Sequence, residues 1–184
     1  MTRLIALPQD TATGKTKELF NAIEGKLGMV PNMMKTMGNS SAFLEGYLNL
    51  SNALSSASLG AKTGELIALA VAEANACNYC LSAHTYIGVN MFKIKEDVMI
   101  AARSGKSADP KIDAILKFAV SLVIKSGHVD DADVAAVKTA GVTDGQIGEI
   151  IGHVALNVLT NYLNNTARTA IDFPVVETFA KLAA

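Results

Sequence analysis

Both cysteines of the chain, Cys77 and Cys80, lie in one short segment, and His84 follows four residues after the second. Residues three or four apart on a helix share a face, with Cβ atoms about 5 to 6 Å apart. That spacing suits a disulfide after a small adjustment, and it lets an imidazole exchange a proton with either sulfur. Because the chain has no third cysteine, an intramolecular disulfide in the monomer must join these two. The segment is therefore a candidate dithiol redox centre.

The reactivity of this centre depends on how readily a thiol ionises. An ordinary thiol with a pKa of about 8.5 is about 3% thiolate at pH 7, and lowering its pKa by about two units makes it mostly thiolate. A helix that begins near Cys77 favours the thiolate through its free amides and positive dipole end. Either of two carboxylates could anchor His84. Glu73 extends the same stripe if the helix is continuous, whereas Glu65 would approach from a preceding helix, in an apolar run where a charged group needs a partner.

The elements that must hold these residues are helical, because apolar residues recur three and four positions apart along nearly the whole chain. Asp109 followed by Pro110 is a strong helix start, and no segment alternates as a strand would. The pattern predicts helices over residues 15–27, 40–57, 62–75, 77–90, 95–103, 110–126 and 143–168, with shorter ones over 33–37 and 130–141. The predicted fold is all-α, in a single helical domain over residues 1–184.

An internal repeat is also indicated. Moving the segment that starts at Thr63 along by 81 residues lays it on the one that starts at Asp144, with the same polar start and apolar stripe. In that register Cys80 falls on Asn161, so the second copy would keep the packing without the redox groups. The alternative is that any two amphipathic helices align passably.

The composition narrows the class of protein. The residues are 50% hydrophobic and 18% charged, so more apolar surface exists than one core is expected to bury, which favours a homo-oligomer. A net charge of −1 with scattered lysines and arginines gives no basic field for nucleic acid. No apolar stretch is long enough to span a membrane, and no export signal is recognisable. The sequence therefore predicts a cytoplasmic protein whose cysteines are reduced at rest and act as a working or sensing dithiol.

Glu65, eleven further residues and then Cys77-x-x-Cys80-x-x-x-His84 resemble the core motif of the alkyl hydroperoxidase D and carboxymuconolactone decarboxylase family. The similarity extends through residues 28–32, 109–119 and 140–147 and is typical of the peroxidase-related branch. The resemblance implies an all-helical subunit that assembles as a trimer or hexamer and reduces hydroperoxides.

The resemblance also implies roles for four residues. Cys80 would attack the peroxide and become a sulfenic acid, Cys77 would condense with it to form the disulfide, and Glu65 and His84 would relay protons through water. The implied reductant is an external dithiol of the dihydrolipoyl type, which a partner protein could carry, with no bound cofactor or metal. One position departs from the family: Tyr79 stands where the best-characterised peroxidase has a histidine, and a tyrosine is no base near neutral pH.

Three alternatives remain open at this stage. A lyase of the decarboxylase type would need cationic or polar groups that the sequence does not identify. A zinc site could use both cysteines, His84 and Glu73, although structural zinc sites usually draw ligands from two separate segments. A redox sensor would form the same disulfide without turnover.

Other polar and sulfur-containing residues are predicted to be structural. The cluster Met29, Met33, Met34 and Met37 is interpreted as pliable packing that could line an entrance for an apolar peroxide. His128 and His153 are not expected to react. The last long helix carries a polar band that is interpreted as a hydrogen-bonded seam between helices or subunits, formed by Asn157, Asn161, Asn164 and Asn165.

Overall fold

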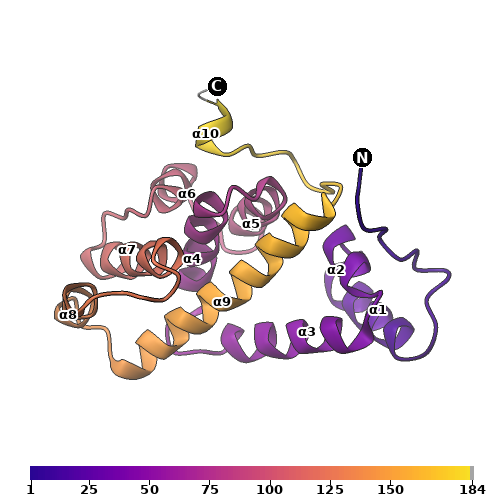
Figure 1. Cartoon of the computed structure of the whole chain (residues 1–184), viewed down its shortest axis with the longest axis horizontal. Helices are drawn as coiled ribbons and strands as arrows, with labels where there is room; N and C mark the ends of the chain where they lie inside the picture. Colours follow the sequence, from indigo (N-terminus) through magenta and orange to yellow (C-terminus); the bar gives the residue numbers. More distant parts are fainter. Residues whose placement is uncertain (183–184) are drawn as a thin grey trace.

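The computed structural model describes residues 1–182, and within them the chain folds entirely into helices and connecting loops (Figure 1). The helices are α1 (Gly14–Leu27), α2 (Asn32–Met37), α3 (Ser41–Ser55), α4 (Ala61–Ala74), α5 (Asn78–Asn90), α6 (Glu96–Arg103), α7 (Pro110–Ile124), α8 (Asp131–Thr139), α9 (Asp144–Ala167) and α10 (Phe179–Leu182). The all-α prediction is confirmed.

Helix α4 is the centre of the fold. Every residue from Gly64 to Ala72 is buried, and the helix packs against α5, α6, α7 and α9. A helix that is apolar on all sides belongs in a core, and the run from Leu66 to Ala72 has this property. Glu65 is the one charged residue within this buried stretch. Glu65 therefore stands on a helix that is buried on all sides around it.

The observed helices begin and end close to the predicted positions, and the caps explain their starts. The Asp109 side chain accepts hydrogen bonds from the first amides of α7, and Thr143 forms a capping box with Gln146 at the start of α9. Helix α7 ends two residues earlier than predicted, because Ser126 adopts a positive φ of 51° that closes the helix. The short helix α10 was not predicted.

The chain turns sharply between α4 and α5, where the cysteine segment begins. The Ala76 amide bonds to Glu73 O and the Cys77 amide to Ala72 O, which together form a Schellman motif. Ala76 adopts the left-handed conformation that this motif requires, with φ 50°. Cys77 therefore closes α4 through its backbone and caps α5 through its side chain, and both helix ends fix its position.

Helix α9 crosses the molecule between α3 on one side and α4, α5 and α7 on the other (Figure 1). It is continuous from Asp144 to Ala167. In the register of the internal repeat, the break between α4 and α5 would fall near residues 156–158, where α9 shows no interruption. The second half of the chain therefore does not repeat the break between α4 and α5, the most distinctive feature of the first half.

The segment after α9 returns across the outside of α5 and is held there by polar contacts. The Val176 amide donates to Ser82 Oγ at 2.9 Å, and the Phe179 amide donates to Glu73 Oε1 at 2.7 Å. Arg103 Nε bonds to Glu73 Oε2 at 2.8 Å, and its guanidinium lies 3.9 Å from the centroid of the Phe179 ring. Both carboxylate oxygens of Glu73 therefore bind groups that hold the C-terminal segment in place.

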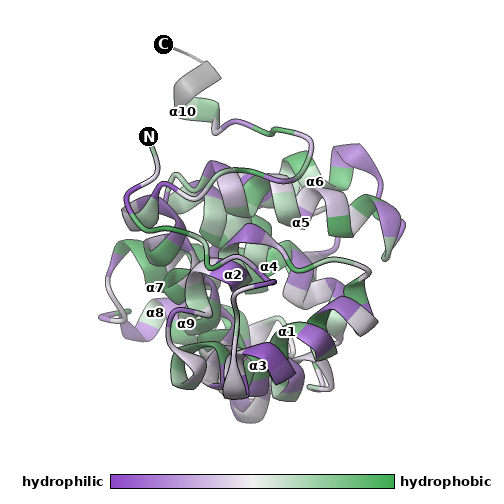
Figure 2. Cartoon of the chain, turned by 90° about the vertical axis from the view of Figure 1, so that its right-hand side faces the viewer, coloured by the Kyte–Doolittle hydropathy of each residue, from purple (hydrophilic) through white to green (hydrophobic). Residues whose placement is uncertain are grey.

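Hydrophobic residues line the inner helices and also reach the outside of several others (Figure 2). Exposed examples with large side chains are Tyr86, Met91, Ile100, Ile124, Ile151 and Tyr162. Homo-oligomerisation remains a prediction that this surface favours. In the part of the chain that the structure describes, no helix has the length and apolar character needed to cross a membrane.

Candidate functional site

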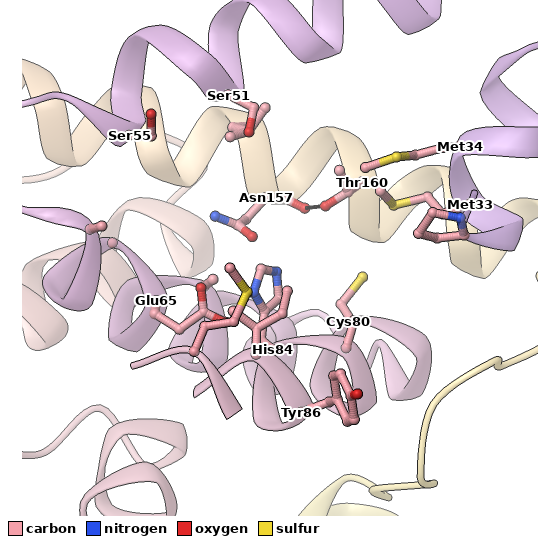
Figure 3. A pocket seen from close by; sticks show the side chains of 18 of the residues that line it. Met33, Met34, Ser51, Ser55, Glu65, Cys80, His84, Tyr86, Asn157 and Thr160 are labelled. Carbon is pink, nitrogen blue, oxygen red and sulfur yellow. Dashed lines mark hydrogen bonds and ion pairs between the residues drawn. The ribbon is translucent and has the colours of Figure 1, made fainter. Parts of the chain in front are cut away.

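A cavity of about 350 Å³ lies between α2 and α3 on one side and α4, α5 and α9 on the other. Its wall is mostly apolar and includes Met29, Met33, Met34, Tyr47, Phe92 and Phe173. Three of the four methionines of the predicted cluster line it, whereas Met37 is buried in the core. Glu65, Cys80 and His84 face the same space (Figure 3).

The two cysteines are both reduced and occupy different environments. Cys77 is fully buried and does not line the cavity, and its Sγ accepts a hydrogen bond from the Cys80 amide at 3.3 Å. Cys80 follows one turn into α5, and its sulfur faces the cavity. A substrate in the cavity therefore meets Cys80 first, with Cys77 behind it.

The carboxylate that anchors His84 is Glu65. His84 Nδ1 lies 2.8 Å from Glu65 Oε1, which joins α5 to the buried core helix α4. The other candidate, Glu73, is turned away toward Arg103. The zinc-ligand set that includes Glu73 is consequently not assembled, and no group of three His, Cys, Asp or Glu residues among residues 1–182 is arranged to hold a metal ion.

Asparagines of α9 reach the sulfur from the opposite side. Asn164 Nδ2 donates to Cys80 Sγ at 3.3 Å, and Asn75 Nδ2 donates to Asn161 Oδ1 at 3.0 Å. Asn157 lines the cavity next to His84. These bonds join α9 to neighbouring segments, as the interpretation of the band as a seam between helices predicts, and Asn165 adds a bond to the Asn75 carbonyl. Asn164 and Asn157 also border the site, which the sequence did not indicate.

The surroundings of Cys80 favour its thiolate. Burial opposes ionisation, but a hydrogen bond from Cys77, the positive charge of His84 and the amides of Asn164 and Asn161 outweigh it and lower the pKa of Cys80 to about 7. The pKa of Cys77 is raised, because its proton bonds to Cys80, because it is buried and because a Cys80 thiolate repels a second negative charge. One thiolate and one thiol are thus the stable combination near neutral pH.

The charge state of His84 follows from its partners. Burial lowers the pKa of His84, but the charge of Glu65 and the hydrogen bond to it, together with the Cys80 thiolate and Asn157, raise it above the ordinary value. The imidazolium is therefore favoured beside the thiolate. The site holds a nucleophile and a proton donor in adjacent positions.

Tyr79, the residue that departs from the family motif, has a packing role. Its hydroxyl accepts a hydrogen bond from the Met33 amide at 3.1 Å, and its ring lies edge-on to Phe173 with centroids 5.9 Å apart. Burial raises the pKa of Tyr79, so the phenol stays neutral. Tyr79 ties α5 to α2 and helps to close one wall of the cavity.

His153 was not expected from the sequence to belong to the site, but it is among the residues that line the cavity. The signal that could have identified it is its spacing on α9, because His153, Asn157, Thr160 and Asn164 follow one another at three or four residues and share a face. A polar stripe on an otherwise apolar helix predicts a polar environment opposite it.

The two cysteines thus lie in a helical protein, and comparisons with known proteins identify its family resemblance and its fold. The sequence model of the carboxymuconolactone decarboxylase family matches residues 41–108, which include the motif. The resemblance to this family is thereby confirmed. No curated protein matches the chain at a significant level.

Solved structures with the same fold extend over nearly the whole chain. An uncharacterised peroxidase-related protein from Ralstonia eutropha JMP134, described as an alkylhydroperoxidase AhpD core, has a TM-score of 0.82 at 24% identity and covers 93% of this chain and 92% of its own. A peroxidase-related protein from Silicibacter sp. TM1040 has a TM-score of 0.78 at 24% identity, covering 92% and 94%. The debrominase Bmp8 in its apo form has a TM-score of 0.78 at 20% identity, covering 94% and 93%. These likenesses show that the chain has the AhpD-like fold.

Proposed function

We propose that the chain is a thiol-dependent peroxidase of the alkyl hydroperoxide reductase type. The observation that supports this most is that Cys80 lines an apolar cavity while Cys77 is buried, with its Sγ 3.3 Å from the Cys80 amide. The lowered pKa of Cys80, about 7, agrees with a role as the nucleophile. A thiolate is the nucleophile in thiol chemistry, and an organic hydroperoxide is an apolar molecule with one electrophilic oxygen. The proposed catalytic residues are Cys80, Cys77, His84 and Glu65.

The first step consumes the hydroperoxide. The Cys80 thiolate attacks the outer peroxide oxygen, the O–O bond breaks, and the departing alkoxide takes the proton of the His84 imidazolium. The products are a Cys80 sulfenic acid, an alcohol and a neutral imidazole. Glu65 stabilises the imidazolium before the step and orients the ring throughout.

The second step forms the disulfide, and the different pKa values of the two thiols support the proposed order in which they react. The hydrogen bond of the Cys77 thiol to Cys80 is the largest cause of the raised pKa of Cys77, followed by burial and by the charge of the Cys80 thiolate. Once Cys80 is an uncharged sulfenic acid, that charge is removed, so Cys77 ionises more readily and attacks the Cys80 sulfur. The sulfenic hydroxyl leaves with the thiol proton as water, and the S–S bond forms.

The cycle closes with an external dithiol, for which we propose the dihydrolipoyl class, free or carried by a partner protein. Exchange with that dithiol restores both thiols and oxidises the reductant, and Cys80 returns its proton to His84. A cytoplasmic location and a homo-oligomeric assembly, trimer or hexamer, are part of the same proposal. No cofactor is needed for any of these steps.

The lyase alternative fits the cavity less well. A lactone acid is anionic and needs cationic partners. The imidazolium of His84 is already paired with Glu65, and no lysine or arginine lines the cavity within the described residues. The apolar wall suits a neutral organic substrate better.

The decisive experiment is a free-thiol titration before and after one equivalent of cumene hydroperoxide, with and without dihydrolipoamide. Loss of both thiols, followed by their recovery and by repeated turnover, is expected. Disulfide formation without turnover would identify a sensor, and no reaction would refute the peroxidase. A brominated pyrrole, the class of ligand seen with Bmp8, tests dehalogenation in the same assay.

Two variants assign the sulfurs. Cys80→Ser should not react with the hydroperoxide, whereas Cys77→Ser should react once and accumulate a sulfenic acid that dimedone traps. The reverse pattern would exchange the attacking and resolving roles.

A further inference from the structure

Asn157 is a buried amide at the cavity wall that the proposed reaction leaves without a role. The residue is 5% exposed and stands on α9. Its Nδ2 donates to the backbone carbonyl of His153, one turn earlier, at 2.8 Å. A carbonyl oxygen can only accept a hydrogen bond, so the nitrogen of the amide, and not its oxygen, must lie on that side. The backbone of α9 therefore fixes which way the amide faces.

The oxygen of the amide is consequently the end that is free to act on the site. In Figure 3 it is turned toward His84. Burial lowers the pKa of His84, whereas the charged groups around the ring and a hydrogen bond to Asn157 raise it above its ordinary value. Since Nδ1 of the ring already lies 2.8 Å from Glu65 Oε1, the nitrogen left for Asn157 is Nε2. An amide oxygen only accepts, so Nε2 has to carry a proton.

The two acceptors together select one charge state of the ring. A neutral imidazole carries a single N–H and leaves either the Glu65 carboxylate or the Asn157 oxygen without a donor, whereas the imidazolium satisfies both. Asn157 is so deeply buried that water does not readily replace a lost donor, and an unpaired buried acceptor is costly. The amide thereby favours the imidazolium of His84 although it carries no charge of its own.

The titratable groups around the His84 ring agree with a positive charge there. Glu65 from α4 and the Cys80 thiolate from α5 are negative and attract it. Burial raises the pKa of Tyr47 on α3 to about 12 and lowers the pKa of His153 on α9, so both of these groups are uncharged at pH 7. No lysine or arginine among the described residues lines the cavity. No positive group of the cavity wall therefore competes with the imidazolium.

We propose that Asn157 is a positioning residue for the proton donor: its oxygen holds the Nε2–H of His84 at the cavity wall until a departing alkoxide takes that proton. This role rests on the proposed peroxidase function, whereas the effect of Asn157 on the ring can be measured without a substrate. A neutral amide oxygen is a weaker acceptor than an alkoxide, so the proton passes to the alkoxide and gives the alcohol. The Glu65 carboxylate keeps the other proton on Nδ1, and the ring becomes neutral.

The test measures the pKa of His84 by NMR in the reduced wild-type protein and in two variants at position 157. Asn157→Leu removes the acceptor, so the pKa of His84 should fall by about one unit, as the loss of a hydrogen bond to a charged group implies. Asn157→Asp replaces the amide by a carboxylate of the same shape, so the pKa of His84 should rise instead. A residue that only fills space would not shift the pKa in opposite directions in these two variants.

The matched control is Asn165→Leu, the same substitution at an exposed position of α9 whose amide bonds to the Asn75 carbonyl, and it should keep the wild-type pKa of His84. Should the variants at position 157 fail to fold, the wild-type protein decides: the Nε2 proton of His84 should be protected from exchange with water and should be the one lost on titration. An unchanged pKa in folded Asn157→Leu, a pKa that does not rise in Asn157→Asp, or an unprotected Nε2 proton would overturn the proposal.

The outcome is separable from that of the peroxidase proposal. If the pKa of His84 responds to position 157 but hydroperoxides do not oxidise Cys80, the contact with the ring stands and the reaction is wrong. If hydroperoxides are reduced but the pKa does not respond, the reaction stands and the role of Asn157 is wrong. Where both hold, oxidation of Cys80 by cumene hydroperoxide should slow as pH rises through the pKa of His84, because the step needs the imidazolium. That decline should move to lower pH in Asn157→Leu and to higher pH in Asn157→Asp.

Discussion

Replacing Asn164 by leucine should raise the pKa of Cys80, because the Asn164 amide donates directly to its sulfur. Leucine has a similar volume and no hydrogen-bonding group, so the buried position stays filled while the N–H to sulfur contact is lost. Asn164 itself is 3% exposed, so water would not replace the donor fully. The thiolate would then be stabilised by the remaining groups, which are the hydrogen bonds from Cys77 and Asn161 and the charge of His84.

The magnitude follows from the strength of a hydrogen bond to a charged group. Such a bond contributes about 1.5 to 3 kcal/mol, which corresponds to a rise in the thiol pKa of about one to two units. From a starting pKa of about 7, the thiolate fraction of Cys80 at pH 7 would fall from about one half to between about a tenth and a hundredth. Greater nucleophilicity of the more basic thiolate would offset part of this loss.

The assay is the rate of alkylation by iodoacetamide across pH, with mass spectrometry to assign the modified cysteine. Reactivity at Cys80 should rise with pH through its pKa and then level off, and the Asn164→Leu curve should be displaced to higher pH and recover at alkaline pH. Asn165→Leu is the matched control, since that neighbouring amide is exposed and bonds only to the Asn75 carbonyl. Its curve should coincide with that of the wild type.

An unshifted curve for Asn164→Leu in a folded protein would refute the reasoning, because it would mean that the amide does not stabilise the thiolate. A curve that is lower at every pH without displacement would indicate altered access to the sulfur. In that case the contribution of α9 to the site would be steric.

Two further changes test the carboxylate and the close packing. Glu65→Gln removes the charge that raises the pKa of His84. An NMR titration of the His84 imidazole should then give a lower pKa, and peroxide reduction at pH 7 should slow about tenfold. The control Glu73→Gln should leave the pKa of His84 unchanged. Gly64→Ala gains about 1 kcal/mol of helix propensity but drives a Cβ into a histidine ring 2.6 Å away, which costs about 1 to 3 kcal/mol. Urea unfolding should therefore show a net loss of stability of up to about 2 kcal/mol. Gly148→Ala, with open space around the new Cβ, should instead stabilise the protein by up to about 1 kcal/mol.

The helices could be predicted from the sequence because their signals are local. Apolar spacing, the Asp109 and Thr143 caps and the glycines after helices depend on neighbouring residues only, and the helix ends agree to within a few positions. The cysteine motif was likewise recognisable, because Cys77, Cys80 and His84 lie on one helical segment. Their contacts depend on the period of that helix and on little else.

The rest of the site could not be predicted, because it depends on which helices meet. Glu73 is closer to the cysteines in sequence, but the Schellman turn after α4 breaks the stripe and sends its carboxylate to Arg103. Asn164 lies 84 residues beyond Cys80 and reaches it only because α9 crosses α5. A long-range contact of this kind leaves no mark in local spacing, so the asparagine band could be recognised as polar but not assigned to the sulfur.

Helix α9 brings together parts of the site that lie far apart in the sequence. It supplies the Asn164 amide at the Cys80 sulfur and the Asn157 side chain beside His84, and it is continuous from Asp144 to Ala167. An uninterrupted helix fixes the separation of two of its side chains by its rise per residue. The amide at the sulfur and the amide beside the imidazole are therefore held in one register, and this register can change only if α9 bends or moves against the buried helix α4.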